Sequence, residues 1–196
     1  LFRSAGARTA LRRRYPTMQL PHDLGAHVTA TPPVQPGPPP PARIRVLALA
    51  VLLWRDHLLC AEGYDTVKRQ TFFRPLGGGV EFGERAEATV ARELHEELGM
   101  AVEVREALGV IENLFTYQGR PGHEVVFEYV CVPAPGHAPA TLAPLTAIEG
   151  EARFVARWLP LAEVLGGTHR VYPEGLVERL TAWVNRLATT TEAVPA

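Results

Sequence analysis

The chain has 196 residues and a formal net charge of −1, with 46% hydrophobic and 21% charged residues. This length suits one folded domain with extra tail and leaves little room for two. Because a phosphate-binding surface needs an excess of basic side chains to displace counterions, the near-neutral charge argues against nucleic acid as a partner.

Cysteine usage and hydropathy bear on the compartment. Cys60 and Cys131 both lie in apolar runs, which is typical of buried free thiols and not of a disulfide framework or a metal knuckle. A reducing cytoplasm fits that pattern. The longest apolar run, Val46 to Trp54, has nine residues, whereas a membrane span needs about 20. We therefore predict a cytoplasmic protein with no membrane partner.

The first 42 residues differ in composition from the rest. Residues 1–18 carry five arginines and no acidic residue, and residues 31–41 form the run TPPVQPGPPPP, which excludes helix and central strand. We predict a disordered basic and proline-rich segment over residues 1–42, for which a transit peptide and a misassigned start both stay open. The folded domain is predicted over residues 43–188, and a disordered tail over 189–196.

The first half of the predicted domain holds strands followed by one helix. The apolar segments IRVLALAVLLW and LLCAEGY are predicted strands, and TFFRPLGGG leads into a glycine-rich turn. A helix is predicted from about Glu87 to Leu98, and Gly99 ends it. A long antiparallel hairpin follows, built from AVEVREALGVIENLFTY and HEVVFEYVCVP around the turn QGRPG.

The C-terminal part begins with a polar, Pro/Ala-rich loop over about Ala134 to Glu151. The strand RFVARWLP, the short helical turn LAEVL and the amphipathic helix PEGLVERLTAWVNRL follow it. Strands outnumber helices, and the helices fall between groups of strands. The predicted fold class is therefore α+β or mixed α/β.

The predicted helix before Gly99 carries two different faces. Glu93, Glu96 and Glu97 stand at positions i, i+3 and i+4, so their carboxylates share one face. Val90 and Leu94 lie on the adjoining face, which we expect to pack on the sheet. Like charges at this spacing destabilise a helix by a few tenths of a kcal/mol per pair. A hard cation such as Mg²⁺, which prefers oxygen ligands, would remove that repulsion.

The chain before the helix supplies Gly77, Gly78 and Gly79. Backbone at such glycines can approach a ligand closely and can turn a carbonyl toward a metal. Taken alone, however, the glycines and the acidic run are better explained by a turn followed by a solvated helix face.

The wider spacing is far more specific than the acidic run. Gly78 is followed after five residues by Glu84, and Glu84 after seven residues by RELHEELGM, which runs from Arg92 to Met100. This arrangement resembles the Nudix hydrolase signature G-x5-E-x7-R-E-U-x-E-E-x-G-U, in which U is a bulky aliphatic residue. Every specified position is filled. The wider resemblance extends over roughly residues 43 to 187.

The resemblance implies a fold, a reaction and a cofactor. Nudix hydrolases are mixed α/β/α sandwiches with a mixed β-sheet between helices. They cleave a pyrophosphate linkage in a nucleoside diphosphate joined to another moiety X, by attack of metal-activated water. The implied metal is Mg²⁺, with Mn²⁺ as an alternative, held by Glu93, Glu96, Glu97 and the backbone carbonyl of Gly77 or Gly78.

The resemblance also implies supporting and substrate-binding roles. Arg92 and Glu84 are expected to form an ion pair that ties the glycine segment to the helix. Many relatives place a further acid after the hairpin, as a base or extra metal ligand, and here Glu149 or Glu151 would supply it from a flexible loop. The candidate substrate contacts, an arginine for phosphate and aromatic rings for a nucleobase, are Arg74, Phe115 and Tyr117.

Three points stay open. The intact motif favours an enzyme, and the alternative is a non-catalytic nucleotide-sensing module. The predicted ligand is a nucleotide-type small molecule in either case. His123 and Glu124 either line the pocket or, as polar residues at a strand end usually do, face water. Relatives are often dimers, so a homodimer is open as well.

Overall fold

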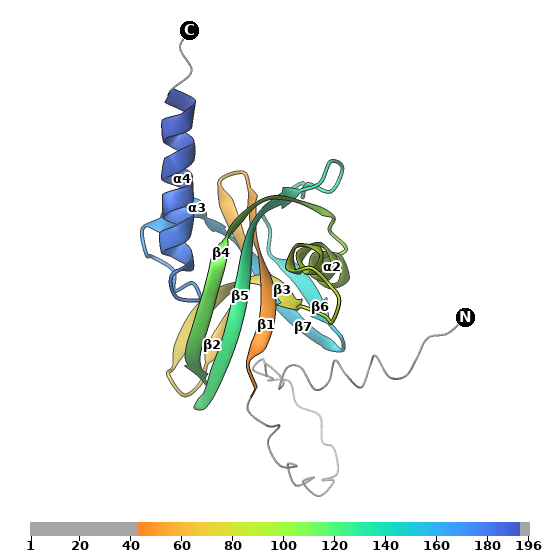
Figure 1. The fold of residues 1–196 in the computed structure, drawn as a ribbon, viewed down its shortest axis with the longest axis vertical. Coiled ribbons are helices and arrows are strands. Elements are labelled where there is room, and N and C mark those ends of the chain that lie inside the picture. Colours follow the sequence, from red (N-terminus) through yellow and green to blue (C-terminus); the bar gives the residue numbers. More distant parts are fainter. Residues whose placement is uncertain (1–42, 193–196) are drawn as a thin grey trace, which may run out of the picture. The chain divides into compact units, whose positions relative to one another are not determined.

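The computed structural model of the chain describes residues 43–192. The predictions for residues 1–42 and for the last four residues of the tail lie outside this range. Figure 1 shows the arrangement of the described elements. Their bounds are β1 Arg45–Trp54, β2 His57–Asp65, β3 Gln70–Gly79, α2 Ala86–Leu98, β4 Val102–Tyr117, β5 Arg120–Pro133, β6 Leu145–Glu149, β7 Ala152–Pro160, α3 Leu161–Leu165 and α4 Leu176–Glu192.

The strands form one mixed sheet of seven strands in the order β4-β5-β1-β3-β2-β7-β6. The β1–β5 pair is parallel, and its neighbours in the sheet are antiparallel. Strand β3 joins the two parts, because residues 76–79 pair with β1 whereas residues 70–75 pair with β2. In Figure 1, β4, β5 and β1 stand side by side, with α2 and α4 toward opposite sides of the molecule. This architecture confirms the predicted α+β class.

The β4–β5 hairpin confirms the predicted pairing and shortens the predicted turn. Only Gln118 and Gly119 separate the strands, both with positive φ (52° and 73°), as a tight two-residue hairpin turn requires. The tip is tied to the β2–β3 turn, where buried Asp65 accepts the backbone N–H of Gln118 at 3.3 Å and those of Val67 and Lys68 at 2.9 Å. Burial alone would raise the pKa of Asp65, but these N–H donors lower it overall.

Two large groups of apolar side chains make up most of the core of the described residues, and Leu47, Leu49 and Val126 form a third, smaller group. Val90 and Leu94 of α2 are fully buried against Ala48, Ala50 and Leu76, as the helical spacing predicts. The second group joins α3 and α4 to the sheet, and its buried members are Val51, Leu58, Cys60, Leu159, Val164, Val171, Leu176 and Leu180. The position of α2 on the sheet is therefore fixed by its apolar face. The face that carries the glutamates is not needed for this packing.

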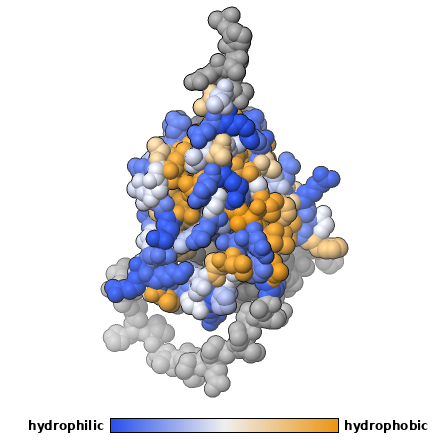
Figure 2. Space-filling view, turned by 60° about the vertical axis from the view of Figure 1, so that its left-hand side comes forward, coloured by the Kyte–Doolittle hydropathy of each residue, from blue (hydrophilic) through white to orange (hydrophobic). Residues whose placement is uncertain are grey.

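Helix α4 reaches further than the sequence predicts. It continues to Glu192, so residues 189–192, predicted from the sequence as part of a disordered tail, are helical. Leu187 near its end is exposed, in contrast to the buried Leu180. The side of the molecule seen in Figure 2 carries apolar patches broken by polar side chains. The helix therefore runs past the core that its first turns cover.

A buried ion pair fastens α4 to the sheet. Glu128 of β5 is fully buried, and its Oε2 accepts a hydrogen bond from Arg179 Nε at 2.8 Å. Burial raises the pKa of Glu128, and Arg179 opposes that rise. Gly109 lies at an irregularity of β4, where an added Cβ would come within 2.9 Å of Arg179 Cδ.

Both cysteines are free and buried, as their apolar surroundings predict. None of the helices within residues 43–192 combines the length and the apolar character that crossing a bilayer would need.

Candidate functional site

Helix α2 presents its three glutamates at very different depths. The Glu97 residue is only 7% exposed, whereas the Glu96 side chain is 54% exposed and Glu93 lies between them. The difference arises because α2 lies over β1, β3 and β6, so the helix flank that carries Glu97 turns toward the sheet. The exposure of the three glutamates on this face therefore decreases from Glu96 through Glu93 to Glu97.

The three glycines belong to strand β3 and do not form the predicted turn. Gly77, Gly78 and Gly79 continue the ladder with β1, opposite Leu49, Ala48 and Leu47. Their role is steric, because a Cβ on Gly78 would collide with the Glu93 carboxylate. Gly77, with φ of 136°, would likewise collide with the carbonyl oxygen of Ala48. The glycines thus let a carboxylate pack directly on strand backbone.

An arginine clasp joins the segment after β3 to the helix. Arg92 Nε and Nη2 donate to the two oxygens of Glu84 at 2.8 and 3.0 Å, and Nη2 also donates to the carbonyl of Gly79 at 3.2 Å. Arg92 Nη1 donates to Glu93 Oε1 at 2.9 Å. The hydrogen bonds from Arg92, assisted by one from Thr89, lower the pKa of Glu84 to about 2 although burial opposes them. The contact expected between Arg92 and Glu84 is present.

The two candidate acids after the hairpin have different surroundings. The predicted flexible loop is wrong in its last part, because residues 145–149 form strand β6, paired with β7. Ala147 is buried under α2, so the strand forms through contacts that are distant in sequence. Glu149 is the last residue of β6 and is partly buried, whereas Glu151 is exposed in the turn that follows. The structure brings Glu149 close enough to the helix carboxylates for its charge to act on Glu97.

The electrostatics show how closely these acids interact. Burial raises the pKa of Glu97 to about 9, and the charges of Glu149 and Glu93 add to that rise while Arg74 opposes it. The pKa of Glu149 is raised by burial and by Glu93, and it is lowered by Arg74 and Arg45. Glu93, Glu97 and Glu149 therefore form a cluster of like charges, which we call the carboxylate cluster.

The carboxylate cluster has the chemistry of a cation site without being closed around one. Within residues 43–192, no three His, Cys, Asp or Glu side chains are already gathered closely enough to hold a metal ion. Glu97 Oε2, however, is buried and accepts no hydrogen bond from the described residues. A buried charge without a partner is costly, and a hard divalent ion with oxygen ligands would supply the missing partner. The residues present therefore fit such an ion.

The three candidate substrate contacts are not brought together. Arg74 of β3 acts on both Glu97 and Glu149, and its Nη2 is buried without a hydrogen-bond partner in the described part of the chain. The Phe115 ring instead covers Gly122 across the hairpin. Tyr117 packs edge-on against Phe72, with ring centroids 5.7 Å apart. Only Arg74 thus joins the carboxylate cluster.

A cavity of about 520 Å³ lies beside the N-terminal end of α2. Val46, Val80, Phe127 and Tyr129 give it apolar walls, and residues 84–87 complete it. Its lining includes none of the members of the carboxylate cluster.

Three polar residues near the start of β1 were not identified from the sequence as a group. Glu124 is only 2% exposed, so the option that it faces water is wrong. It pairs with Arg45 of β1 and accepts a hydrogen bond from Asn113 Nδ2 of β4 at 3.2 Å. The sequence did carry a signal for the burial of Glu124. Side chains alternate between the two faces of a strand, and Glu124 shares its face with buried Val126 and Glu128. His123, on the other face, pairs with Glu112.

Comparison with known proteins bears on the family. The model of the NUDIX domain matches residues 44–180, which is more than half of the chain. A NUDIX-family hydrolase from Clostridium perfringens is 15% identical, with 74% of this chain and 99% of its own covered and a TM-score of 0.50. The E. coli ORF135 protein is 22% identical, with 72% and 91% covered, and a NUDIX hydrolase from Nitrosomonas europaea is 16% identical, with 73% and 90% covered. Both give a TM-score of 0.49.

The match over most of the folded chain defines the class of protein. It is that of the Nudix pyrophosphohydrolases, enzymes that generally use divalent metal ions. The chain belongs to the NUDIX family, as the spacing from Gly78 to Met100 predicts.

Proposed function

We propose that the protein is a Mg²⁺-dependent hydrolase that cleaves the pyrophosphate linkage of a nucleoside diphosphate joined to another moiety X. Mn²⁺ is the alternative ion. The observation that supports this most strongly is the buried Glu97 Oε2, which has no hydrogen-bond partner among the described residues and lies within reach of the charges of Glu93 and Glu149. A site that only solvated its carboxylates would have no reason to bury this one.

The residues divide into holders of the ion and of the substrate. Glu93, Glu96 and Glu97, with a backbone carbonyl of Gly77 or Gly78, would hold the ion. When bound, the ion neutralises phosphate charge and lowers the pKa of a coordinated water. Arg74, whose Nη2 is buried and has no hydrogen-bond partner among the described residues, is suited to a phosphate oxygen.

The remaining residues position these groups and move a proton. Arg92 and Glu84 keep α2 in register with β3 through the bonds described above. Glu149 interacts with Glu93 and has a raised pKa, so it is suited to accept the proton of the attacking water. In the overall reaction, one water oxygen bonds to phosphorus, one bridging P–O bond breaks, and the water proton passes to the protein. We assign this role to Glu149 in preference to Glu151.

The proposal also covers ligand class and compartment. The net charge of −1 supports a nucleotide-type small molecule and not nucleic acid. Two free buried cysteines support a cytoplasmic location. The homodimer stays a prediction, to be tested by sedimentation.

The test is a substrate screen with phosphate detection, run with Mg²⁺, with Mn²⁺ and with EDTA. The panel comprises nucleoside triphosphates, diphosphate sugars, dinucleotides and oxidised nucleotides. We expect Mg²⁺-dependent release of phosphate products, lost in Glu97→Gln and retained in Glu87→Gln, which alters an exposed glutamate of the same helix. If the protein bound nucleotides but released no product with either metal, the nucleotide-sensing alternative would replace the hydrolase.

A further inference from the structure

Strand β4 forms one border of the sheet and leaves part of its backbone without a partner. It stands at the end of the strand order and pairs only with β5 among the described strands. Tyr117 and Arg120 flank the two-residue turn and therefore form a hydrogen-bonded pair. Because such pairs alternate along antiparallel strands, the backbone groups of Val110, Glu112 and Leu114 point away from β5. No other backbone group within residues 43–192 bonds to them.

This unpaired stretch has a clear limit at each end. Toward the hairpin tip, the carbonyl of Thr116 accepts a hydrogen bond from the Lys68 ammonium group. Toward the other end, the register is irregular between Ala107 and Gly109. A bulge and a lysine are common means of shielding an edge strand from other chains. Between these shields lie residues 110–114, which contain neither lysine nor proline.

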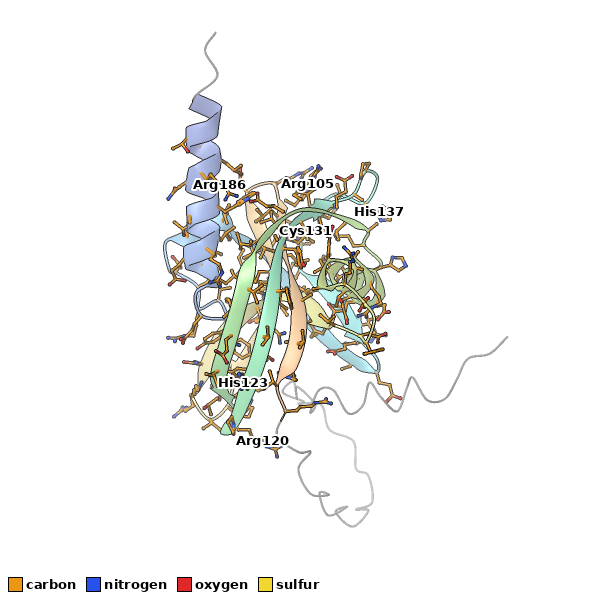
Figure 3. The ribbon with its side chains drawn as sticks, in the orientation of Figure 1. Arg105, Arg120, His123, Cys131, His137 and Arg186 are labelled. Atoms are coloured by element: carbon orange, nitrogen blue, oxygen red, sulfur yellow. The ribbon has the colours of Figure 1, made fainter. Side chains whose placement is uncertain are left out.

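The side chains of residues 110–114 suit contact with another protein chain. Val110 is 54% and Leu114 is 70% exposed, although both are aliphatic. Glu112, midway between them, has its Oε1 3.0 Å from His123 Nε2. Figure 3 shows His123 toward the hairpin tip, far from Arg186 of α4, so α4 leaves this half of β4 uncovered. The stretch is thus an unshielded sheet edge with exposed apolar side chains.

The side-chain pattern is symmetrical about Glu112, which favours a second copy of this chain as the partner. Val110 stands two residues before Glu112, and Leu114 stands two residues after it. In an antiparallel pair with a two-fold axis at Glu112, Val110 of each chain lies opposite Leu114 of the other, so the same contact forms twice. The outward backbone groups of all three residues are then paired, since each residue lies opposite one that also points outward.

We propose that β4 pairs through residues 110–114 with the same strand of a second copy, antiparallel about a two-fold axis at Glu112. The two sheets join edge to edge by backbone hydrogen bonds. Glu112 lies opposite its own copy, where like charges oppose pairing. Its contact with His123 of β5 draws the carboxylate away from the axis. So short a paired segment makes a small interface, and the dimer is therefore weak and reversible.

The first test is sedimentation of the full chain over about 1–200 µM, in which we expect a monomer–dimer equilibrium. Glu112→Pro removes an N–H group that points away from β5. The β4–β5 hydrogen bonds should therefore remain, and the dimer should weaken at least about tenfold. Glu112→Gln removes the like charges at the axis and should tighten the dimer about threefold. The glutamine variant also serves if proline prevents folding.

Disulfide trapping tests the register, with oxidised glutathione as the oxidant. The native thiols Cys60 and Cys131 are buried and do not compete. Glu112→Cys should cross-link by itself, because this residue lies opposite its own copy at a separation that a disulfide can span. Val110→Cys and Leu114→Cys should each cross-link slowly alone and at least about tenfold faster when mixed, since the two positions face each other.

Arg105→Cys is the matched control for trapping. Arg105 is 58% exposed on the same strand, beyond the irregular part near Gly109. Figure 3 shows it at the end of the hairpin away from His123. This variant should cross-link slowly.

Three results would overturn the inference. The first is a wild type that stays monomeric over the whole concentration range, which would leave the edge to a different partner. The second is a folded Glu112→Pro that dimerises like the wild type, and the third is cross-linking of Arg105→Cys as fast as that of Glu112→Cys. None of these measurements involves hydrolysis, so failure of the proposed function would leave this inference standing.

Discussion

Replacing Glu97 with glutamine should stabilise the metal-free protein at neutral and alkaline pH. The pKa of Glu97 is raised from 4.5 to about 9, so between these values the folded protein holds a proton that the unfolded chain has released. The stability that protonated Glu97 contributes is therefore fully present below pH 4.5 and is lost as the pH rises toward 9. Glutamine keeps the shape of the protonated acid and cannot ionise, so this loss should be absent in the variant.

The magnitude follows from the width of the pH window. Each pH unit between the two pKa values costs about 1.4 kcal/mol. At about pH 7.5 the wild type should therefore be less stable than Glu97→Gln by up to about 4 kcal/mol, and at about pH 4 the two should be equal. Mg²⁺ should reverse the order at high pH, because it binds the ionised carboxylate of the folded wild type alone.

The assay is urea unfolding over a pH series, first with EDTA and then with Mg²⁺. Glu87→Gln is the control and should follow the wild type, since Glu87 is exposed on the first turn of α2. Parallel curves of unfolding free energy against pH for wild type and Glu97→Gln would refute the argument. That outcome would mean that Glu97 is solvated and is not a buried carboxylate available to bind a metal ion.

Three other substitutions test the supports of the site. Glu84→Gln should cost about 3 kcal/mol in urea unfolding at neutral pH, because the pKa of Glu84 is lowered to about 2. That stability is present above pH 4.5 and should fade in the wild type as the pH falls through about 2, whereas the variant should lack this acid-linked loss. Gly78→Ala should abolish the Mg²⁺-dependent rise in melting temperature and lower activity about a hundredfold, since its methyl group displaces the Glu93 carboxylate. An unchanged Mg²⁺ response would contradict that reasoning. Arg179→Met should cost about 3 kcal/mol by leaving Glu128 buried and unpaired, and Arg179→Met/Glu128→Leu should recover most of it in the same unfolding assay. Equal losses in the single and double variants would show that α4 depends on contacts other than this pair.

Local signals account for the parts of the fold that the sequence predicts well. The bounds of α2 follow from 3.6-residue periodicity and from Gly99, which ends the helix in the left-handed region. The β4–β5 hairpin follows from two apolar runs around a glycine-containing turn. The spacing from Gly78 to Met100 identifies the family because it specifies positions that the fold brings together.

The misjudged parts depend on contacts that are distant in sequence. Strand β6 has five residues in a proline- and alanine-rich stretch, and it becomes a strand through pairing with β7 and cover from α2. Three consecutive glycines suggest a turn, and they extend β3 because Glu93 needs the space of a missing side chain. The burial of Glu97 had a local signal that was missed, because Glu97 stands seven residues after Val90 and three after Leu94, on the same buried face of α2.

The glycine end of β3 also limits how this enzyme could change its substrate. Gly77 and Gly78 carry no side chain, and adding one at either position would cause a steric collision. A side chain at either position would first displace the Glu93 carboxylate or the Ala48 backbone, so these positions have little freedom to vary. A protein engineer would leave these two glycines untouched and vary other positions when seeking new specificity.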